Sequence, residues 1–482
     1  MPFTPGDPWP SDTPGGAAPL AWGGYVRFWL LAEIAAGLPF TLGQHPNDRL
    51  NAGNALGDAS VIAYQPDTPD PAALPTTGRL WADLSCDIVD VEIAAGSGTG
   101  HGILSKAEAG TLSVELYDPT GRYDPFNPST PFALNGRSRL IPGVRVLAFC
   151  EIVSNPTATP ATVIQVPLFS GTADRWSQEW AKEPSDRRGR MVATDFTKRL
   201  VKMDRAEQPP VGAGEAVITR LNRIADYFSF NRPTQWVTGG TRTLAATTLA
   251  QSAWELMNRA IDDELGYLWV IPSTAAAFGA GIVWTPREAW SDTSLPVIQL
   301  GCGGPGFFDI VTDATPLGFD ADMLNTVAAS RSGGTAQSAS NPASVNRWGE
   351  KSHSRTDLGL ADDTQAATWA QDLVNLSAFP RQALEQIKMQ PQVAPNSWAA
   401  FASGILTPMF VLRRARVVYE NDNFDYTVDV TVRAVGYTHR ITADTWEVEW
   451  RTVSADVGAM AQTFHMGPDA FDRLDAGNVL AA

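Results

Sequence analysis

The chain has 482 residues, of which 44% are hydrophobic, and a formal net charge of −16. This length predicts about three domains, each with enough apolar residues for a core. The negative charge argues against a free nucleic-acid-binding protein, because phosphate contacts need clustered Lys and Arg. The densest basic run, Arg187-Arg188-Gly189-Arg190, is interpreted as a solvated turn.

The N-terminal residues predict an arm followed by a small apolar region. Residues 1–24 are rich in Pro and Gly and cannot fold alone, so we expect a flexible arm or a strip that orders against a partner. Residues 25–78 form a small N-terminal region. Its apolar window, Phe28 to Leu42, is too short to cross about 30 Å of hydrocarbon as a helix and starts too late for a signal peptide. We therefore expect a core element here, in a soluble protein made in a cytoplasm.

Residues 79–203 predict the first β-rich unit. Apolar and polar residues alternate over Thr111–Tyr117, as in a half-buried strand, and a long loop stiffened by prolines follows. Val144–Val153 is apolar enough to be a strand buried on both faces. The alternation over Leu84–Ile93 changes phase midway, at Ile88-Val89, which predicts a bulged strand. Further strands are expected at Thr162–Trp176 and Met191–Phe196.

Residues 204–310 predict an α/β insertion. Apolar residues recur at helical spacing over Val217–Phe228 and over Trp254–Leu265. Thr248 and Gln251 form a candidate capping box before the second helix. The strands expected after it are Gly266–Val270 and Gly281–Trp284, paired as a hairpin.

Residues 311–453 return to strands, with regular alternation over Tyr426–Ala434 and Trp446–Arg451. Between the earlier and later strands lies one predicted helix, with Asp362 and Gln365 as its cap. Its core-facing residues are Ala366, Trp369, Ala370 and Leu373. Residues 454–482 carry little pattern and predict a loose C-terminal arm. The predicted fold is mainly β with an α/β insertion, and each β-rich unit is a barrel or a sandwich.

The sequence predicts no catalytic, cofactor-binding or metal-binding residues. Gly301-Cys302-Gly303-Gly304-Pro305-Gly306 matches G-x-G-x-x-G, but a strand-like run, Phe307–Val311, follows where a dinucleotide site needs a helix. A Ser/His/Asp triad can be drawn around His353, but nothing fixes its geometry, and a polar loop or strand is the simpler interpretation. No calcium site is predicted, because the candidate aspartates lack the spacing of an EF-hand loop. They are Asp118, Asp124, Asp320, Asp322, Asp362 and Asp363.

The cysteines and tryptophans favour structural roles. Cys86, Cys150 and Cys302 form no C-x-x-C pair, which predicts reduced and mostly buried thiols. The 16 Trp residues leave two hypotheses open. Exposed rings could stack on sugars beside acidic pairs that hydrolyse a glycosidic bond. The tryptophans that instead fall on apolar faces, and so favour packing in a core or at subunit contacts, are Trp254, Trp369, Trp446 and Trp450.

Three stretches resemble the minor tail proteins at the tail tips of long-tailed phages of actinobacteria. The first is AEAGTLSVELYDPTGRYDPFNPSTPF at 107–132, continued by LIPGVRV at 140–146 and LFSG at 168–171. The second is DMLNTVAASRSGGTAQSASNPASVNRWGEKSHSRTDL at 322–358, followed by Phe379-Pro380-Arg381. The third is AVGYTHRITADTWEVEWRTV at 434–453. They mark a structural family and contain no catalytic motif.

That family is similar to the baseplate hub proteins of contractile tails, in which two β-barrel domains of each chain build a ring from three copies. The resemblance implies two β-barrel hub domains, at 79–203 and 311–453, and a homotrimer at the tail tip of a siphophage virion. Such a hub joins the tail tube and distal tail ring to the host-contacting tip. Its partners would be distal tail and tail tube proteins, the tape-measure protein, and other minor tail or receptor-binding proteins.

The resemblance also implies a non-enzymatic structural protein without cofactors or stable membrane insertion, made in the cytoplasm of the host bacterium. Phage DNA would leave through the ring without specific binding. Because an acidic lining repels phosphates, we expect acidic side chains to face this channel. A carbohydrate-binding or cell-wall-degrading tail protein is the alternative, and it requires exposed Trp beside two carboxylates.

Overall fold

The computed structural model describes 21 segments of the chain. They are residues 25–39, 61–63, 77–97, 104, 106–130, 132–134, 137–154, 162–179, 181–183, 186–205, 208–229, 234–236, 240–272, 281–286, 297–302, 311–316, 323–380, 384–390, 414–421, 426–442 and 445–455. The expected N-terminal arm and residues 456–482 of the expected C-terminal arm lie outside them.

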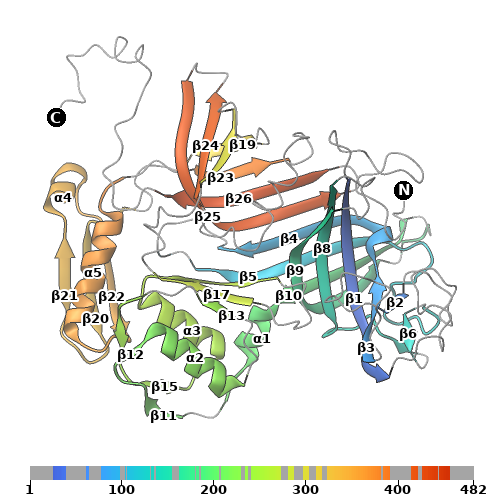
Figure 1. Ribbon diagram of the computed structural model, residues 1–482, viewed down its shortest axis with the longest axis horizontal. Coiled ribbons are helices and arrows are strands. Elements are labelled where there is room, and N and C mark those ends of the chain that lie inside the picture. The colour runs from blue at the N-terminus through green and yellow to red at the C-terminus, as the bar shows by residue number, and fades with distance from the viewer. Residues whose placement is uncertain are drawn as a thin grey trace.

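One mainly antiparallel sheet of 14 strands dominates the described structure (Figure 1). Its strands are β1 (Tyr25–Pro39), β2 (Val61–Ala63), β3 (Thr77–Asp83), β4 (Ile88–Gly96), β5 (Glu108–Tyr117), β8 (Arg145–Ser154), β9 (Thr162–Glu179), β10 (Arg188–Asp195), β18 (Ile298–Gly301), β19 (Val311–Pro316), β23 (Leu384–Met389), β24 (Arg414–Asn421), β25 (Tyr426–Thr442) and β26 (Trp446–Ser454). The main order is β19-β23-β26-β25-β4-β5-β10-β9-β8-β1-β3-β2, and β24 pairs with both β18 and β25.

The sheet joins the two β-rich parts of the chain through the antiparallel pair β4–β25. Its register runs from Gly436 opposite Gly96 to Thr442 opposite Asp90. Gly96 has φ 86°, and a Cβ atom there would lie 2.4 Å from the carbonyl oxygen of Val435, so a glycine is required at this crossing. Within the described residues the strand order is open between β19 and β2, and no closed barrel forms. The predicted β-rich units are therefore present as strands of one sheet.

The predicted strand pattern is largely confirmed. The phase change at Ile88 is a β-bulge in the β4–β5 pair, and β8 is buried over Val146–Cys150. One part of the prediction is wrong, because Ser85–Asp87 forms a 3-10 turn, η1, instead of continuing a strand. The cause is contact with β1: Leu30 N donates to Ser85 Oγ at 2.8 Å, and Leu84 N donates to Leu30 O at 2.9 Å.

The α/β insertion packs its helices beside short strand pairs. Its elements are β11 (Gln208–Val211), β12 (Glu215–Ala216), α2 (Val217–Phe228), β13 (Thr234–Trp236), β14 (Thr243–Leu244), β15 (Thr247–Leu249), α3 (Ala253–Asp262), β16 (Tyr267–Ile271) and β17 (Gly281–Thr285). The helix α1 (Phe196–Lys202) precedes it in the chain. The predicted β16–β17 hairpin is confirmed. The predicted cap of α3 is wrong: Ser252 and Glu255 form the capping box, because an N-cap must adjoin the first helical residue and Thr248 lies in β15.

A separate unit of one three-stranded sheet and two helices lies at one end of the molecule (Figure 1). It contains β20 (Thr326–Arg331), β21 (Gln337–Ser340), α4 (Pro342–Trp348), β22 (Ser352–Leu358) and α5 (Asp363–Ser377). Asp362 accepts the N–H of Gln365 at 2.9 Å, which confirms the predicted cap of α5. The predicted core face of α5 is also confirmed, since Ala366, Trp369, Ala370 and Leu373 are fully buried.

Two hydrophobic cores group these elements differently from their order in the chain. The first lies under the large sheet and takes strands from both β-rich parts, together with Tyr267 and Trp269 of the insertion. The second joins α2 and α3 to α5 and the β20–β22 sheet. Trp446 and Trp450 in the first core and Trp369 in the second are buried, as their periodic positions predict. The domain limits given above stay predictions.

The two thiols that the structure describes differ in exposure. Cys150 is buried, but Cys302 is exposed, which corrects the expectation for that thiol; the side chain of Cys86 lies outside the described residues. None of the described helices combines the length and the apolar character needed to cross a membrane.

A polar junction at the end of α3 links the insertion to the β20–β22 unit. Asp263 is buried, and its Oδ2 accepts the N–H of Gly359 at 3.1 Å. Arg355 lies 3.9 Å from its Oδ1 and 3.7 Å from the carboxylate of Asp262. Burial raises the pKa of Asp263 to about 7, an effect that Arg355 and the Gly359 N–H oppose.

We predict that Asp263→Asn removes a pH dependence of folding. Between its ordinary pKa and about 7, Asp263 is ionised in the unfolded chain and neutral in the fold, so the wild-type free energy of unfolding falls as pH rises. Over the range from about pH 5 to about pH 8, chemical denaturation should show the wild type losing on the order of a few kcal/mol relative to the variant, because other buried groups such as Asp195 titrate in both proteins. Asp262→Asn is the control, because it removes an adjacent charge and keeps Asp263. If the free energy of unfolding changes with pH in parallel in the wild type and Asp263→Asn, the raised pKa of Asp263 in the fold is contradicted.

Candidate functional site: a charged sheet face

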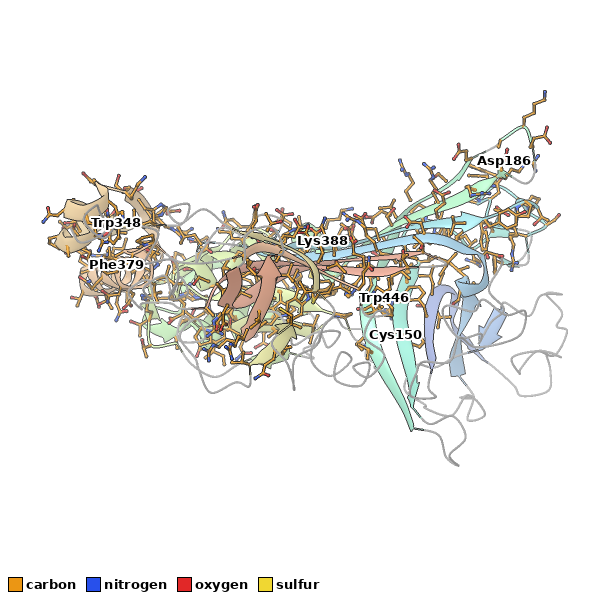
Figure 2. All side chains as sticks on the ribbon, turned by 90° about the horizontal axis from the view of Figure 1, so that it is seen from above. Cys150, Asp186, Trp348, Phe379, Lys388 and Trp446 are labelled. Atoms are coloured by element: carbon orange, nitrogen blue, oxygen red, sulfur yellow. The ribbon has the colours of Figure 1, made fainter. Side chains whose placement is uncertain are left out.

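The solvent-facing side of the large sheet carries charged residues from both β-rich parts of the chain. Residues directly opposite one another on adjacent strands project to the same side, so the register defines this surface. We call the following residues the charged face: Asp90, Glu92, Glu115, Glu179, Arg188, Arg190, Asp313, Lys388, Arg440, Glu447 and Glu449. Figure 2 labels Lys388 on this sheet, with Trp446 nearer the apolar side where Cys150 lies.

Arg440 is the centre of the charged face. It lies 3.6 Å from Glu92 on β4, 3.4 Å from Glu447 and 3.6 Å from Glu449 on β26. One guanidinium therefore neutralises carboxylates from strands that are far apart in the sequence. Because these side chains are partly exposed, the pairs contribute little to stability one by one, and their effect depends on the network.

The other cations of the charged face are paired in the same way. Arg190 lies 3.4 Å from Glu115 and 3.3 Å from Glu179, and Arg188 lies 3.5 Å from Glu115. At the other end of the face, Lys388 and Asp313 are 3.9 Å apart. The sequence interpretation of Arg187–Arg190 as a turn is wrong, because β10 begins at Arg188 and pairs with β5 and β9.

Carboxylates also meet one another on this face. Asp90 stands opposite Glu115, with Glu92 on the same strand. Desolvation, and then the negative charges of Glu92 and Glu115, raise the pKa of Asp90 above its ordinary value, while Arg440 opposes the shift. The face is thus a mixed, largely self-neutralised surface with a local concentration of negative charge around Asp90. Acidic residues were expected on a functional surface, but their pairing with arginines was not.

The G-x-G-x-x-G run begins at a strand end. Gly301 ends β18, and Cys302 follows it; residues 303–310 lie outside the described residues. A Cβ atom on Gly301 would lie 1.8 Å from the carbonyl oxygen of Val418, so this glycine allows close pairing with β24. The next described element is strand β19. Strand pairing therefore accounts for Gly301, and the interpretation of the rest of the run concerns residues outside the described segments.

The residues considered above for acid–base or metal chemistry make contacts within the fold. His353 lies on β22, so its side chain projects to the face opposite Ser352 and Ser354. Desolvation and the nearby charge of Arg355 lower its pKa, and its ring centroid lies 6.4 Å from that of Trp369. Asp118, Asp124 and Asp362 accept backbone N–H groups, and Asp363 pairs with Arg331 at 2.7 Å. Asp320 and Asp322 lie outside the described residues.

No cluster of three or more potential metal ligands occurs in the part of the chain that the structure describes. The candidate site is therefore defined by the charges of its side chains and by their positions on the sheet. Sequence reasoning could find the polar positions of single strands, such as Asp90 and Glu92, from their alternation with apolar neighbours. It could not find that Arg440 joins them, because strand pairing between distant segments leaves no local signal.

Comparison with known proteins gives structural likenesses only. No protein-family model matches the chain, and no curated protein matches its sequence. The fold of the chain is similar to that of a tail protein of Neisseria meningitidis, with a TM-score of 0.46 and 10% identity, covering 76% of this chain and 91% of that one. The 43 kDa tail protein of a Shewanella oneidensis prophage gives a TM-score of 0.46 and 11% identity over 79% of this chain and 96% of that one.

A further similar structure is an Escherichia coli component of the type VI secretion system, described as structurally similar to bacteriophage T4 tail proteins gp27 and gp5. Its TM-score is 0.38 at 8% identity, covering 76% of this chain and 73% of that one. All of these TM-scores lie below 0.5, so no functional inference for this chain rests on the likenesses.

We predict that Arg440→Gln destabilises the sheet in a salt-dependent manner. Removing this charge leaves Glu92, Glu447 and Glu449 near one another without their shared cation. The expected loss is about 1 kcal/mol at low ionic strength, and it should shrink near 1 M salt, where the Debye length is about 3 Å. Chemical denaturation at both salt concentrations measures it. Arg416→Gln, which breaks the exposed pair with Asp429, is the matched control; an equal loss in both variants would contradict the network.

Proposed function

We propose that this chain is a structural virion protein of a phage tail tip: a hub whose copies form a ring around the DNA exit channel. In this proposal the two β-rich parts, 79–203 and 311–453, are the barrel-like hub domains, and 204–310 is inserted between them. The ring is a homotrimer that joins the tail tube and distal tail ring to the host-contacting tip. The tape-measure protein and other minor tail or receptor-binding proteins are its further partners.

The observation that carries this proposal is the pairing of β4 with β25. The resembling stretch 107–132 contributes β5, and the resembling stretch 434–453 contributes β26 and part of β25. These strands lie in the consecutive order β26-β25-β4-β5. Segments that resemble tail-tip proteins therefore build one wall together, which suits a chain that supplies two adjacent sectors of a ring.

The charged face supports the assignment of that wall to a channel. DNA adheres to surfaces on which Lys and Arg are free to replace the counterions of phosphates. On the charged face, Arg440, Arg190, Arg188 and Lys388 all have carboxylate partners. Of two further arginines that the register places on this side, Arg451 donates to the carbonyl oxygen of Ser97 at 2.9 Å, and Arg175 is exposed. A surface whose cations are mostly paired attracts phosphates weakly, which would let DNA pass without specific binding.

The described tryptophans give no support to the carbohydrate-active alternative. Trp284, Trp369, Trp446 and Trp450 are fully buried, whereas stacking on sugar rings requires exposed faces. Trp254 and Trp348 are half-buried, and the ring of Trp348 packs edge-on against Phe379. An assay of host cell-wall turnover tests this alternative directly, and we expect no clearing. Clearing, together with retention of the protein on cell-wall glycan, would contradict a purely structural role.

Assembly and location test the proposal itself. We expect the purified chain to form a ring-shaped homotrimer by light scattering and electron microscopy, with an interface of the permanent class, above about 2,000 Å². Antibodies against the chain should label one end of the tail in intact particles. Particles that lack the chain, or that carry it only as an isolated monomer, would contradict the hub.

A charge variant tests the DNA channel. Replacing Glu92 and Glu447 together by Gln leaves Arg440 with fewer carboxylate partners, so the protein should retain double-stranded DNA at low salt. Retention should decline as salt rises, with a slope set by about one released counterion for each phosphate contact. Glu350→Gln, an exposed change outside the charged face, is the control. Equal DNA retention by both variants in a filter-binding assay would contradict this function of the ion pairs.

A further inference from the structure

The end of α3 carries three consecutive acidic residues, two of which are buried. Asp262 is the last residue of the helix, Asp263 is 2% exposed and Glu264 is fully buried. The negative end of the helix dipole lies here, so further negative charge is disfavoured. The next residue, Leu265, is buried in the left-handed region at φ 58°, which is unfavourable for a residue with a Cβ atom. Backbone strain of this kind is common in segments that switch between conformations.

The buried carboxylate of Asp263 is only partly bonded. Its Oδ2 accepts the N–H of Gly359 at 3.1 Å, but its Oδ1 accepts no hydrogen bond from the residues that the structure describes. Arg355 lies 3.9 Å from Oδ1, which is an ion-pair distance but beyond the length of a hydrogen bond. A buried carboxyl group with so few donors is more stable as the neutral acid than as the anion.

The charged and titratable groups around Asp263 come from each element that packs near it. The cations are Lys106 before β5, Arg242 before β14, Arg259 on α3 and Arg355 on β22. The remaining groups are Asp262, Glu264, His353, Asp357 and Asp372. Arg355 and Arg259 hold the pKa of Asp263 down and the charge of Asp262 raises it, but burial is the largest effect and keeps this pKa high.

The chain between β22 and α5 covers this carboxylate. A Cβ atom on Gly359 would lie 2.6 Å from Asp263 Oδ2, so the backbone there is in close contact with the acid. Backbone hydrogen bonds hold the same stretch to the insertion: Ala245 N donates to Gly359 O at 2.8 Å, and Ala361 N donates to Thr243 O at 3.0 Å. Hydration of an ionised Asp263 on this side therefore requires the covering stretch to move.

We propose that residues 359–361 form a pH-sensitive latch on the end of α3, closed while Asp263 is neutral and opened locally when its carboxylate is ionised. In the open state water hydrates the carboxylate, and Asp263 regains the ordinary acidity of an exposed aspartate. The latch lies between the insertion and the β20–β22 unit, so its state sets how firmly these two parts are connected. This inference goes beyond the proposed function and does not depend on a ring.

Amide hydrogen exchange of the full-length protein tests the latch. The equilibrium constant for opening at Ala245 and Ala361, corrected for the intrinsic exchange rate, should rise about tenfold per pH unit from about pH 5 to about pH 7. It should level off above that range, because Asp263 is then ionised in both states. In Asp263→Asn the constant should not change with pH. Arg355→Gln removes a charge that lowers the pKa of Asp263, so the rise should continue to higher pH.

The amide of Ser97, in the β4–β25 crossing, separates the latch from global unfolding. A local opening exposes little surface, so the constant at Ala245 and Ala361 should exceed that at Ser97 and should not change in low denaturant. Equal constants at all three amides, or a rise with pH that persists in Asp263→Asn, would overturn the latch. So would a wild-type constant that does not change from pH 5 to pH 7. If Asp263→Asn does not fold, the wild-type and Arg355→Gln profiles decide.

Discussion

The pairing of β4 with β25 is the constraint on which the described structure depends. It brings together segments from the two β-rich parts of the chain, and it converts two groups of strands into one continuous sheet. The crossing is tight: Ser97 N and Tyr267 Oη both donate to the carbonyl oxygen of Val435, at 2.8 and 2.6 Å. The insertion is thereby bonded to the same point at which the two parts meet.

The register of this pair also decides which side chains face solvent. A shift by one residue would carry Arg440 and Glu92 to the apolar side and expose Ile441 and Val91. Burial of the apolar set supplies the free energy that fixes the register, since Val91, Ile441 and their neighbours are fully buried. The ion pairs of the charged face then follow from the register. Charge arrangement is in this sense a consequence of core packing, which explains how weak surface pairs can have a defined geometry.

Local features were predictable from the sequence, and long-range pairing was not. Alternation located β25 and β26, and the phase change at Ile88 located a bulge, because these signals lie within a few residues. The cap at Asp362 was found by its spacing, yet the same spacing misplaced the cap of α3, since Thr248–Gln251 and Ser252–Glu255 both fit it. Arg188 and Arg190 were assigned to a turn because solvent-facing strand positions and turns share a composition. The charged face combines residues whose pairing no local pattern encodes.

The two cores meet at β16, whose residues alternate between them: Tyr267 and Trp269 lie in the first core, and Leu268 and Val270 lie in the second. At the end of α3, Asp262 and Asp263 lie where the helix dipole disfavours negative charge, and Arg355 offsets that cost. Buried pairs of this kind add little net stability, because desolvation consumes most of the attraction. The apolar cores therefore stabilise each part, while Tyr267 bonds the insertion to the large sheet at Val435, and Asp263 and Arg355 link it to the β20–β22 unit.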